Sequence, residues 1–125
     1  ARLRAMLEAW LDLVEGLPYR AGCFFAAAAG AVAGQPGPVR ARVAHHTRRW
    51  IEALEDEARL ARRLGELDDG VVPERLAFEL HALVQEANLR RQLLDDPQAF
   101  QEARALLDSI LTRSACSTAS QGGSP

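Results

Sequence analysis

The 125-residue chain has the length of a single domain, long enough to bury a hydrophobic core without disulfides or metal. Hydrophobic residues make up 48% of the sequence and charged residues 26%, a composition that excludes a disordered chain. The 15 basic residues, all arginines, and the 17 acidic residues give a net charge of -2, with both signs interleaved. This balance leaves no cluster of basic residues that could bind a phosphate backbone, so we expect that the chain by itself does not bind DNA.

The two cysteines, Cys23 and Cys116, are far apart, and the second lies in a segment rich in Ser and Gly. This spacing is neither a disulfide framework nor a metal-ligand set, so we expect a reducing, cytoplasmic environment, no metal and no cofactor. The apolar run from Cys23 to Gly34 is too short to cross a bilayer, and we expect no membrane partner. The sequence starts inside a helical pattern, from which we expect that an N-terminal segment is missing.

The first predicted element is an amphipathic helix that ends near Gly16, before Pro18. Its apolar residues recur at helical spacing and are Leu3, Met6, Leu7, Trp10, Leu11, Val14 and Leu17. The alanine-rich run from Gly22 to Gly34 follows. It predicts a short buried helix, because alanine favours helices and β-branched residues are scarce there.

A turn at residues 35–38 precedes a third predicted helix, which begins at Pro38 and runs to about Leu64, with Gly65 as its stop. Its predicted core stripe consists of Val39, Val43, Thr47, Trp50, Leu54, Ala58 and Ala61. The helical wheel places His46 beside Trp50 and directs His45 toward solvent. On the outer face, Glu55 and Arg59 are expected to pair at i,i+4 spacing.

A fourth helix is predicted from Pro73 to Leu94, and it is apolar on two sides. One apolar face comprises Leu76, Leu80, Leu83, Val84 and Ala87, and the second comprises Phe78, Ala82, Leu89 and Leu93. Between them runs an uncharged polar strip of His81, Gln85, Asn88 and Gln92. A helix with two apolar faces must lie between two layers or give one face to a partner subunit.

The fifth predicted helix follows Asp96, which suits an N-cap, with Pro97 at the first helical position, and it runs to about Thr112. This helix is amphipathic through Phe100, Ala103, Leu107 and Ile110. Two C-terminal helices with apolar surface to spare predict a symmetric homodimer, built as a four-helix bundle.

Several segments, in this order along the chain, carry a resemblance to a known family. They are GCFFAAAA (22–29), GQPGPVRARVA (34–44), RRW (48–50), GEL (65–67), PERLAFELHAL (73–83), AN (87–88) and DPQAF (96–100). Together they resemble the C-terminal domain of TetR-family transcription regulators, and the match covers most of the chain before its C-terminal tail.

The resemblance implies an all-α fold of about five helices, in which residues 1–113 bind an effector and dimerise through the last two helices. Residues 114–125 are expected to form a disordered tail. The implied function is that of a repressor's sensing domain, in which a small, largely apolar effector alters DNA binding. DNA is expected as a partner only through an N-terminal helix-turn-helix domain that is absent from this chain.

The candidate effector site combines apolar walls with a few polar groups that orient a ligand. Its candidate residues are Trp10, Phe24, His46, Thr47, Trp50, His81, Gln85 and Asn88. The alternative for each aromatic residue is a place in the core, which is the commoner role at helical spacing. For His46 and His81 the alternative is the role of a hydrogen-bonded histidine in the core or at the dimer interface.

Catalysis has no support in the sequence. The sequence contains no H-E-x-x-H, P-loop, G-x-G-x-x-G or Glu-x-x-His motif, so we expect that the chain is not an enzyme. Cys23 with His46 or His81 would be needed for a cysteine hydrolase, but no local signature supports that pair. The other alternative is a self-standing helical dimerisation module without a DNA-binding head.

Overall fold

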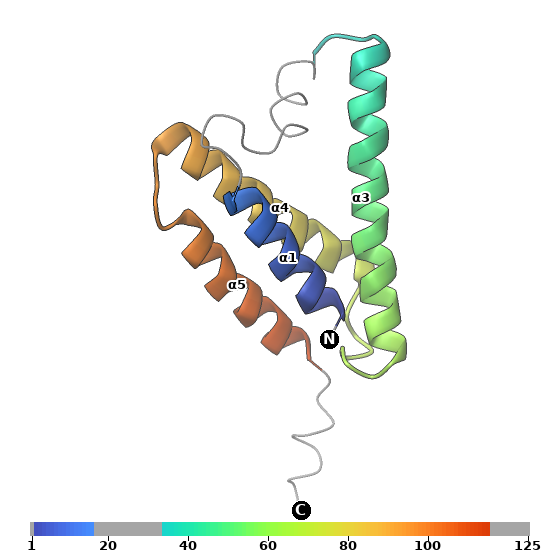
Figure 1. Ribbon diagram of the computed structural model, residues 1–125. Helices are drawn as coiled ribbons and strands as arrows, with labels where there is room; N and C mark the ends of the chain where they lie inside the picture. Colours follow the sequence, from blue (N-terminus) through green and yellow to red (C-terminus); the bar gives the residue numbers. More distant parts are fainter. Residues whose placement is uncertain (1, 17–33, 116–125) are drawn as a thin grey trace, which may run out of the picture.

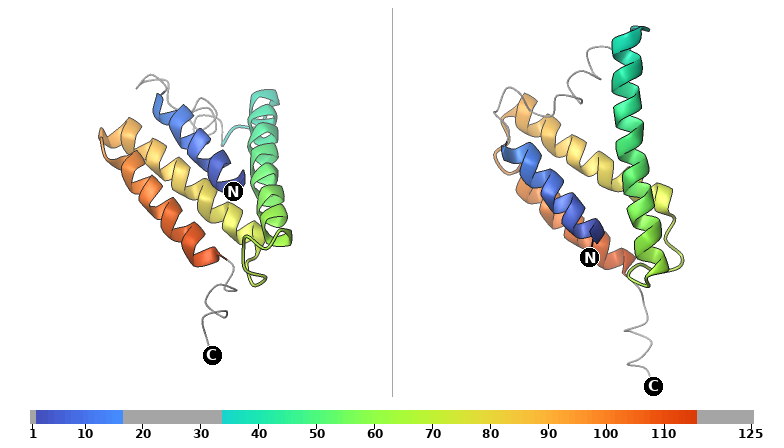
Figure 2. Two further views of the ribbon diagram at one scale, coloured as in Figure 1. Left: turned by 60° about the horizontal axis from the view of Figure 1, so that its bottom comes forward. Right: turned by 45° about the vertical axis from the view of Figure 1, so that its right-hand side comes forward.

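The computed structural model describes residues 2–16 and 34–115. This part of the chain forms four helices: α1 (Arg2–Gly16), α3 (Pro38–Arg63), α4 (Pro73–Leu94) and α5 (Ala99–Ser114). Helices α1, α4 and α5 run side by side, and the long α3 crosses them at one edge (Figures 1 and 2). The all-α fold class is therefore confirmed. The helix predicted between residues 22 and 34 lies, apart from Gly34, outside the described residues.

The hydrophobic core is centred on α4, because α1, α3 and α5 all pack against it. The buried residues of α1 and α5 follow the predicted stripes, and those of α4 follow the first predicted apolar face. They include Leu3, Leu7, Leu11 and Val14 in α1, Leu76, Leu80, Val84 and Ala87 in α4, and Phe100, Ala103 and Leu107 in α5; Pro73, Ala77, Asn88, Ala99 and Leu111 are buried as well. Met6, Trp10, Leu83 and Ile110 pack against this core while half-buried. Helical periodicity thus identified the buried side of these three helices correctly.

Helix α3 follows its predicted stripe only in part. Val43, Leu54, Ala58 and Ala61 are buried, but Val39 is 60% exposed and its assignment to the core is wrong. The N-terminal end of α3 extends past the other described helices, so they do not cover Val39 (Figure 1). Periodicity identifies residues that share a face, but it does not show how far the neighbouring helices reach.

A tight turn at residues 95–98 joins α4 to α5. Asp95 adopts the left-handed conformation (φ 53°, ψ 34°), and its N–H donates to the Arg90 carbonyl. The Asp96 carboxylate accepts the N–H of Gln98 at 3.0 Å, which closes an Asx-type turn. Helix α5 therefore begins at Ala99 with Gln98 as its N-cap. The regular helix begins two residues later than predicted, but the Asp96 carboxylate makes the hydrogen bond to the N–H two residues on that was expected of a capping aspartate.

The loop between α3 and α4 contacts the end of α5. Gly65, with φ 78°, follows the end of α3, as its predicted role as a helix stop requires. Farther along the loop, Leu67 forms an isolated antiparallel bridge with Ala115, and the N–H of Asp68 donates to the Ser114 carbonyl at 3.0 Å. The hydrogen-bonded chain thus extends through Ala115, and the rest of the predicted tail, residues 116–125, lies outside the described residues.

We predict that Leu80→Ala destabilises the domain far more than Leu13→Ala. Leu80 is completely buried, whereas Leu13 on α1 is 64% exposed. Removing a buried leucine side chain costs about 2–5 kcal/mol, and an exposed substitution about 0.5 kcal/mol or less. Urea unfolding of both variants measures the difference, and equal losses would show that α4 is not the centre of the core.

Candidate functional site

Three large side chains from three helices meet beside the core. The ring of Trp10 in α1 lies 4.9 Å, centroid to centroid, from Trp50 in α3, in an edge-to-face arrangement at 76°. The imidazole of His81 in α4 lies 5.7 Å from the same Trp10 ring. Edge-to-face packing is a favourable geometry for aromatic pairs. We call Trp10, Trp50 and His81 the aromatic cluster; all three were predicted as site residues, and all three are half-buried.

The aromatic cluster contains an unused hydrogen-bond donor. The indole Nε1 of Trp50 is buried and has no acceptor in the described part of the chain. A buried N–H group without a partner costs about 1–3 kcal/mol, and most such groups in folded proteins are paired. A ligand atom that accepts this hydrogen bond would remove the cost.

His81 contributes an imidazole that is uncharged at neutral pH. Burial lowers the pKa of His81 below its ordinary value of 6.5, since the charged form loses hydration. A neutral imidazole donates a hydrogen bond at one nitrogen and accepts one at the other. His81 can therefore orient a polar group of either kind beside the two indole rings.

The polar strip of α4 continues from the cluster along the helix. Gln85 is half-buried one turn after His81. Asn88, two turns after His81, is only 7% exposed, and its Oδ1 accepts no hydrogen bond from a described residue. Thr47 is half-buried on α3, one turn before Trp50. These three residues lie on α3 and α4, two of the three helices that form the aromatic cluster.

Two further candidate residues do not join this arrangement. His46 is exposed, with its ring 5.7 Å from that of His45, so its side chain does not lie on the buried side of α3. Trp50 lies at the edge of the buried side of α3, and His46, four residues earlier, is rotated about 40° farther from Leu54. Phe24 lies outside the described residues.

A cavity of about 250 Å³ opens between α3 and α4, and we call it the α3–α4 cleft. Its lining residues are Ile51 and Glu55 of α3 and Glu74, Ala77, Phe78, His81 and Ala82 of α4. His81 both lines this cleft and contacts Trp10, so the cleft adjoins the aromatic cluster. Apart from His81, none of its lining residues was predicted as a site residue.

The carboxylates of the cleft have different partners. Arg59 donates to Asp56 at 2.9 Å and also to Glu74, in place of the predicted i,i+4 pair with Glu55. The pKa of Glu74 lies below its ordinary value, because its carboxylate accepts its own backbone N–H and a hydrogen bond from Arg59. Glu55 is half-buried and forms no hydrogen bond or ion pair with another described residue. Ion pairing between two helices leaves no local pattern in the sequence, and for this reason the α3–α4 cleft was not predicted.

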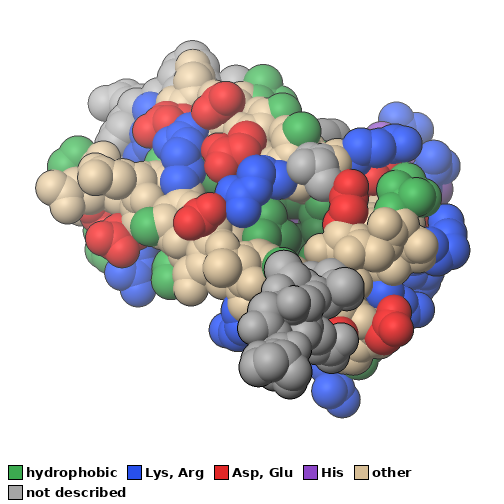
Figure 3. Space-filling model, turned by 90° about the horizontal axis from the view of Figure 1, so that it is seen from below, with side chains coloured by type: hydrophobic (Ala, Val, Ile, Leu, Met, Phe, Trp, Pro, Cys, Tyr) green, Lys and Arg blue, Asp and Glu red, His purple; other side chains and the backbone are tan. Residues whose placement is uncertain are grey.

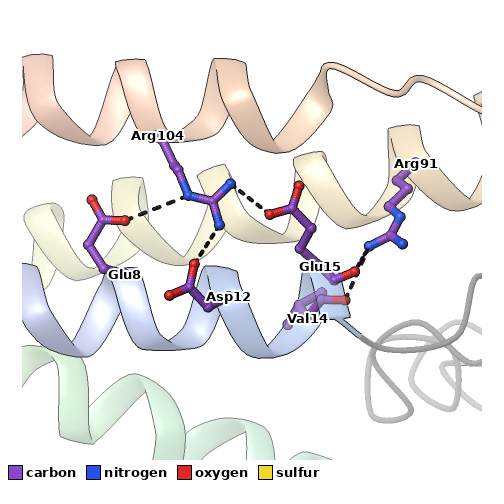
Figure 4. A network of polar contacts seen from close by, with 6 residues as sticks. All are labelled: Glu8, Asp12, Val14, Glu15, Arg91 and Arg104. Atoms are coloured by element: carbon purple, nitrogen blue, oxygen red, sulfur yellow. Dashed lines mark hydrogen bonds and ion pairs between the residues drawn. The ribbon is translucent and has the colours of Figure 1, made fainter.

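Two arginines join α1 to the C-terminal helices (Figure 4). Arg104 of α5 forms ion pairs with Asp12 at 2.7 Å, Glu15 at 2.8 Å and, more distantly, Glu8 at 3.7 Å. The signal for this contact was present in the sequence, since these three carboxylates share one face of α1.

Arg91 of α4 makes the second connection. It donates to the backbone carbonyls of Val14 and Glu15 at the end of α1 (Figure 4). Its guanidinium lies 5.6 Å from the centre of the Phe100 ring. The last carbonyls of a helix have no partner within the helix, and an arginine is a suitable donor to them. Arg91 thereby fixes the end of α1 against α4 and α5.

The second apolar face of α4 is uncovered. Phe78 is 76% exposed, and Ala82, Leu89 and Leu93 are exposed as well. We call these four residues the outer face of α4. On α5, Leu106 is also exposed. An apolar face of this kind typically marks a contact surface.

The surface seen from below interleaves acidic and basic side chains (Figure 3), which agrees with the small net charge. Among the described residues, no group of His, Cys, Asp and Glu could hold a metal ion. No helix in the described ranges combines the length and the apolar character that crossing a membrane requires.

The described chain is thus an all-α domain with a half-buried aromatic cluster and an uncovered apolar face. The family described as "Tetracyclin repressor-like, C-terminal domain" matches residues 1–107. The chain belongs to this family, which confirms the resemblance seen in the sequence. Comparisons with curated proteins and with solved structures found no match.

The lowered pKa of His81 predicts a pH-dependent stability. As the pH falls through 6.5, His81 binds more protons in the unfolded chain than in the folded chain, because its pKa is lowered in the folded state. The free energy of unfolding should therefore fall as the pH decreases through 6.5, and His81→Gln should weaken this fall. Urea unfolding at about pH 7.5 and at about pH 5.5 measures this fall. The control is His45→Gln at an exposed position, and equal slopes in the two variants would contradict the prediction.

Proposed function

We propose that this chain is the effector-sensing and dimerisation domain of a TetR-family transcription regulator of the repressor type, a cytoplasmic protein without catalytic activity. The aromatic cluster, in a chain that belongs to the TetR-like C-terminal domain family, is the observation that carries the proposal. We assign sensing and dimerisation to residues 1–113.

The proposed effector is a small, largely apolar molecule that binds against the aromatic cluster. Ligand sites of this kind combine apolar walls with a few polar groups that fix orientation. The unpaired Nε1 of Trp50 supports the assignment, because an acceptor on the effector would satisfy it. His81 and Gln85 supply the further polar groups, and Asn88 lies farther along the same strip. Phe24, His46 and Thr47 remain candidates for the wall or the entrance of the site.

The proposed dimer buries the outer face of α4. In a two-fold dimer the same face of both copies meets, so that α4 and α5 of the two copies form a four-helix bundle. The exposure of Phe78, Leu89 and Leu93 supports this arrangement, because covering them removes apolar surface from water.

The proposed mechanism is a shift between two arrangements of the dimer. An effector changes that equilibrium only if it binds one arrangement more tightly than the other. DNA-binding domains N-terminal to α1 would then change their separation. Half-sites on DNA lie about 34–36 Å apart per helical turn, so a small tilt of the domains is enough to prevent both from binding their half-sites.

The alternative function is a dimerisation module that senses no ligand. The uncovered outer face of α4, taken alone, would also suit that alternative.

A thermal-shift screen against small hydrophobic molecules tests the sensing role. A ligand at 100 times its Kd adds about 2.7 kcal/mol to the stability of the folded state, so Tm should rise for a few compounds. The rise should be lost in Trp50→Ala and in His81→Ala and kept in His45→Ala, whose side chain is exposed. A dimer that responds to no compound would favour the dimerisation module.

Light scattering tests the proposed interface separately. Leu89→Glu places a charge in the outer face of α4, and we expect it to shift the molecular mass from dimer to monomer. Leu13→Glu introduces the same charge at an exposed position of α1 and should leave the dimer intact. A wild-type chain that is monomeric at micromolar concentration would refute the proposed dimer.

A further inference from the structure

We propose that the α3–α4 cleft binds the charged end of a lipophilic organic cation, such as an ammonium group on an aromatic or alkyl body. This inference names the chemistry of the effector and therefore rests on the proposed function. It commits the cleft to a positively charged ligand, and a neutral occupant is the alternative that the experiment below distinguishes.

The walls of the cleft suit a lipophilic body. Ile51, Ala77, Phe78 and Ala82 provide apolar surface from both helices. Phe78 lines the cleft and also belongs to the outer face of α4, so its ring lies where the cleft meets the proposed dimer interface. A cation within about 6 Å of an aromatic ring is attracted by the electron density on the face of the ring.

The charges around the cleft select the sign of the ligand. Three carboxylates, Glu55, Asp56 and Glu74, lie near Arg59, and Arg62 also acts on Glu74, so two guanidinium groups face three carboxylates. Arg62, the next arginine along α3, donates to the backbone carbonyl of Val71. Glu55 lines the cleft without a hydrogen bond or ion pair to any other described residue. Glu55 interacts with Arg59 only through their charges, so a cation in the cleft would give it a direct ion pair, whereas an anionic ligand would be repelled.

His81 also favours a cationic ligand, and its position indicates that the body of the ligand extends toward the aromatic cluster. Its lowered pKa keeps the imidazole uncharged at neutral pH, so His81 adds no positive charge to the cleft. The contact between His81 and Trp10 links the cleft to the aromatic cluster, where an apolar body can pack. Phe78 and Ala82 also belong to the outer face of α4, so an occupant of the cleft touches the proposed dimer interface.

The test compares two ligands of the same shape that differ in charge. Calorimetric titration of the full chain uses benzyltrimethylammonium and its uncharged carbon analogue, neopentylbenzene. Because contact with a carboxylate and an aromatic ring acts on the cation alone, we expect it to bind about fivefold more tightly or better. Raising the salt concentration should reduce this preference, since ions screen the carboxylates.

Variants then locate the preference in the cleft. Glu55→Gln should remove most of the preference for the cation, whereas Glu52→Gln removes the same charge from an exposed position of α3 and should keep it. If Glu55→Gln does not fold, Phe78→Leu provides the second test, because it keeps an apolar side chain and removes the aromatic ring. That variant should weaken binding of the cation more than binding of the neutral analogue.

Three results would overturn the inference: equal binding of the two ligands, no binding of the cation, or a preference that Glu55→Gln leaves unchanged. The thermal-shift screen separates this failure from failure of the proposed function. Neutral compounds could raise Tm in a way that depends on Trp50 while benzyltrimethylammonium does not bind. That result would refute the proposed cation site and leave the sensing role in place. A chain that binds neither kind of compound would refute both.

Discussion

Burial of one face of α4 fixes the positions of the other three described helices, because each of them packs against it. With Leu80 and Val84 turned into the core, the rotation of α4 about its own axis is set. The same rotation turns His81 toward Trp10 and leaves Phe78 exposed at the surface. The aromatic cluster, the α3–α4 cleft and the outer face of α4 are therefore three results of one packing arrangement.

Helix α1 is positioned by charge as well as by apolar contacts. Arg104 is shared among three carboxylates of α1, and Arg91 holds the carbonyls at the end of that helix (Figure 4). Ion pairs near the surface contribute little stability individually. Their main effect here is orientation, because they fix α1 along and around its axis. The same orientation of α1, with Leu7 and Leu11 in the core, directs Trp10 toward Trp50 and His81.

The sequence predicted the fold better than the site, for physical reasons. Apolar spacing shows which residues of one helix share a face, and this was enough to place Trp10, Trp50 and His81 on buried sides that meet. It does not show where a neighbouring helix ends, so exposed His46 was assigned to the site. The α3–α4 cleft depends on residues from two helices that face each other, and no motif within one helix reveals Glu55 as part of it.

The tight turn at residues 95–98 has a mechanical consequence. Asp95 and Asp96 both donate their N–H groups to the Arg90 carbonyl, so α4 is tied to the start of the turn, and α5 begins at Ala99. With only residues 95–98 between them, neither helix can slide far along the other. A tilt of α4 therefore carries α5 with it, and the two helices move as one lever arm. Displacement along such an arm grows with distance from its pivot, so a small rotation beside the cleft becomes a larger movement at the far end of the hairpin.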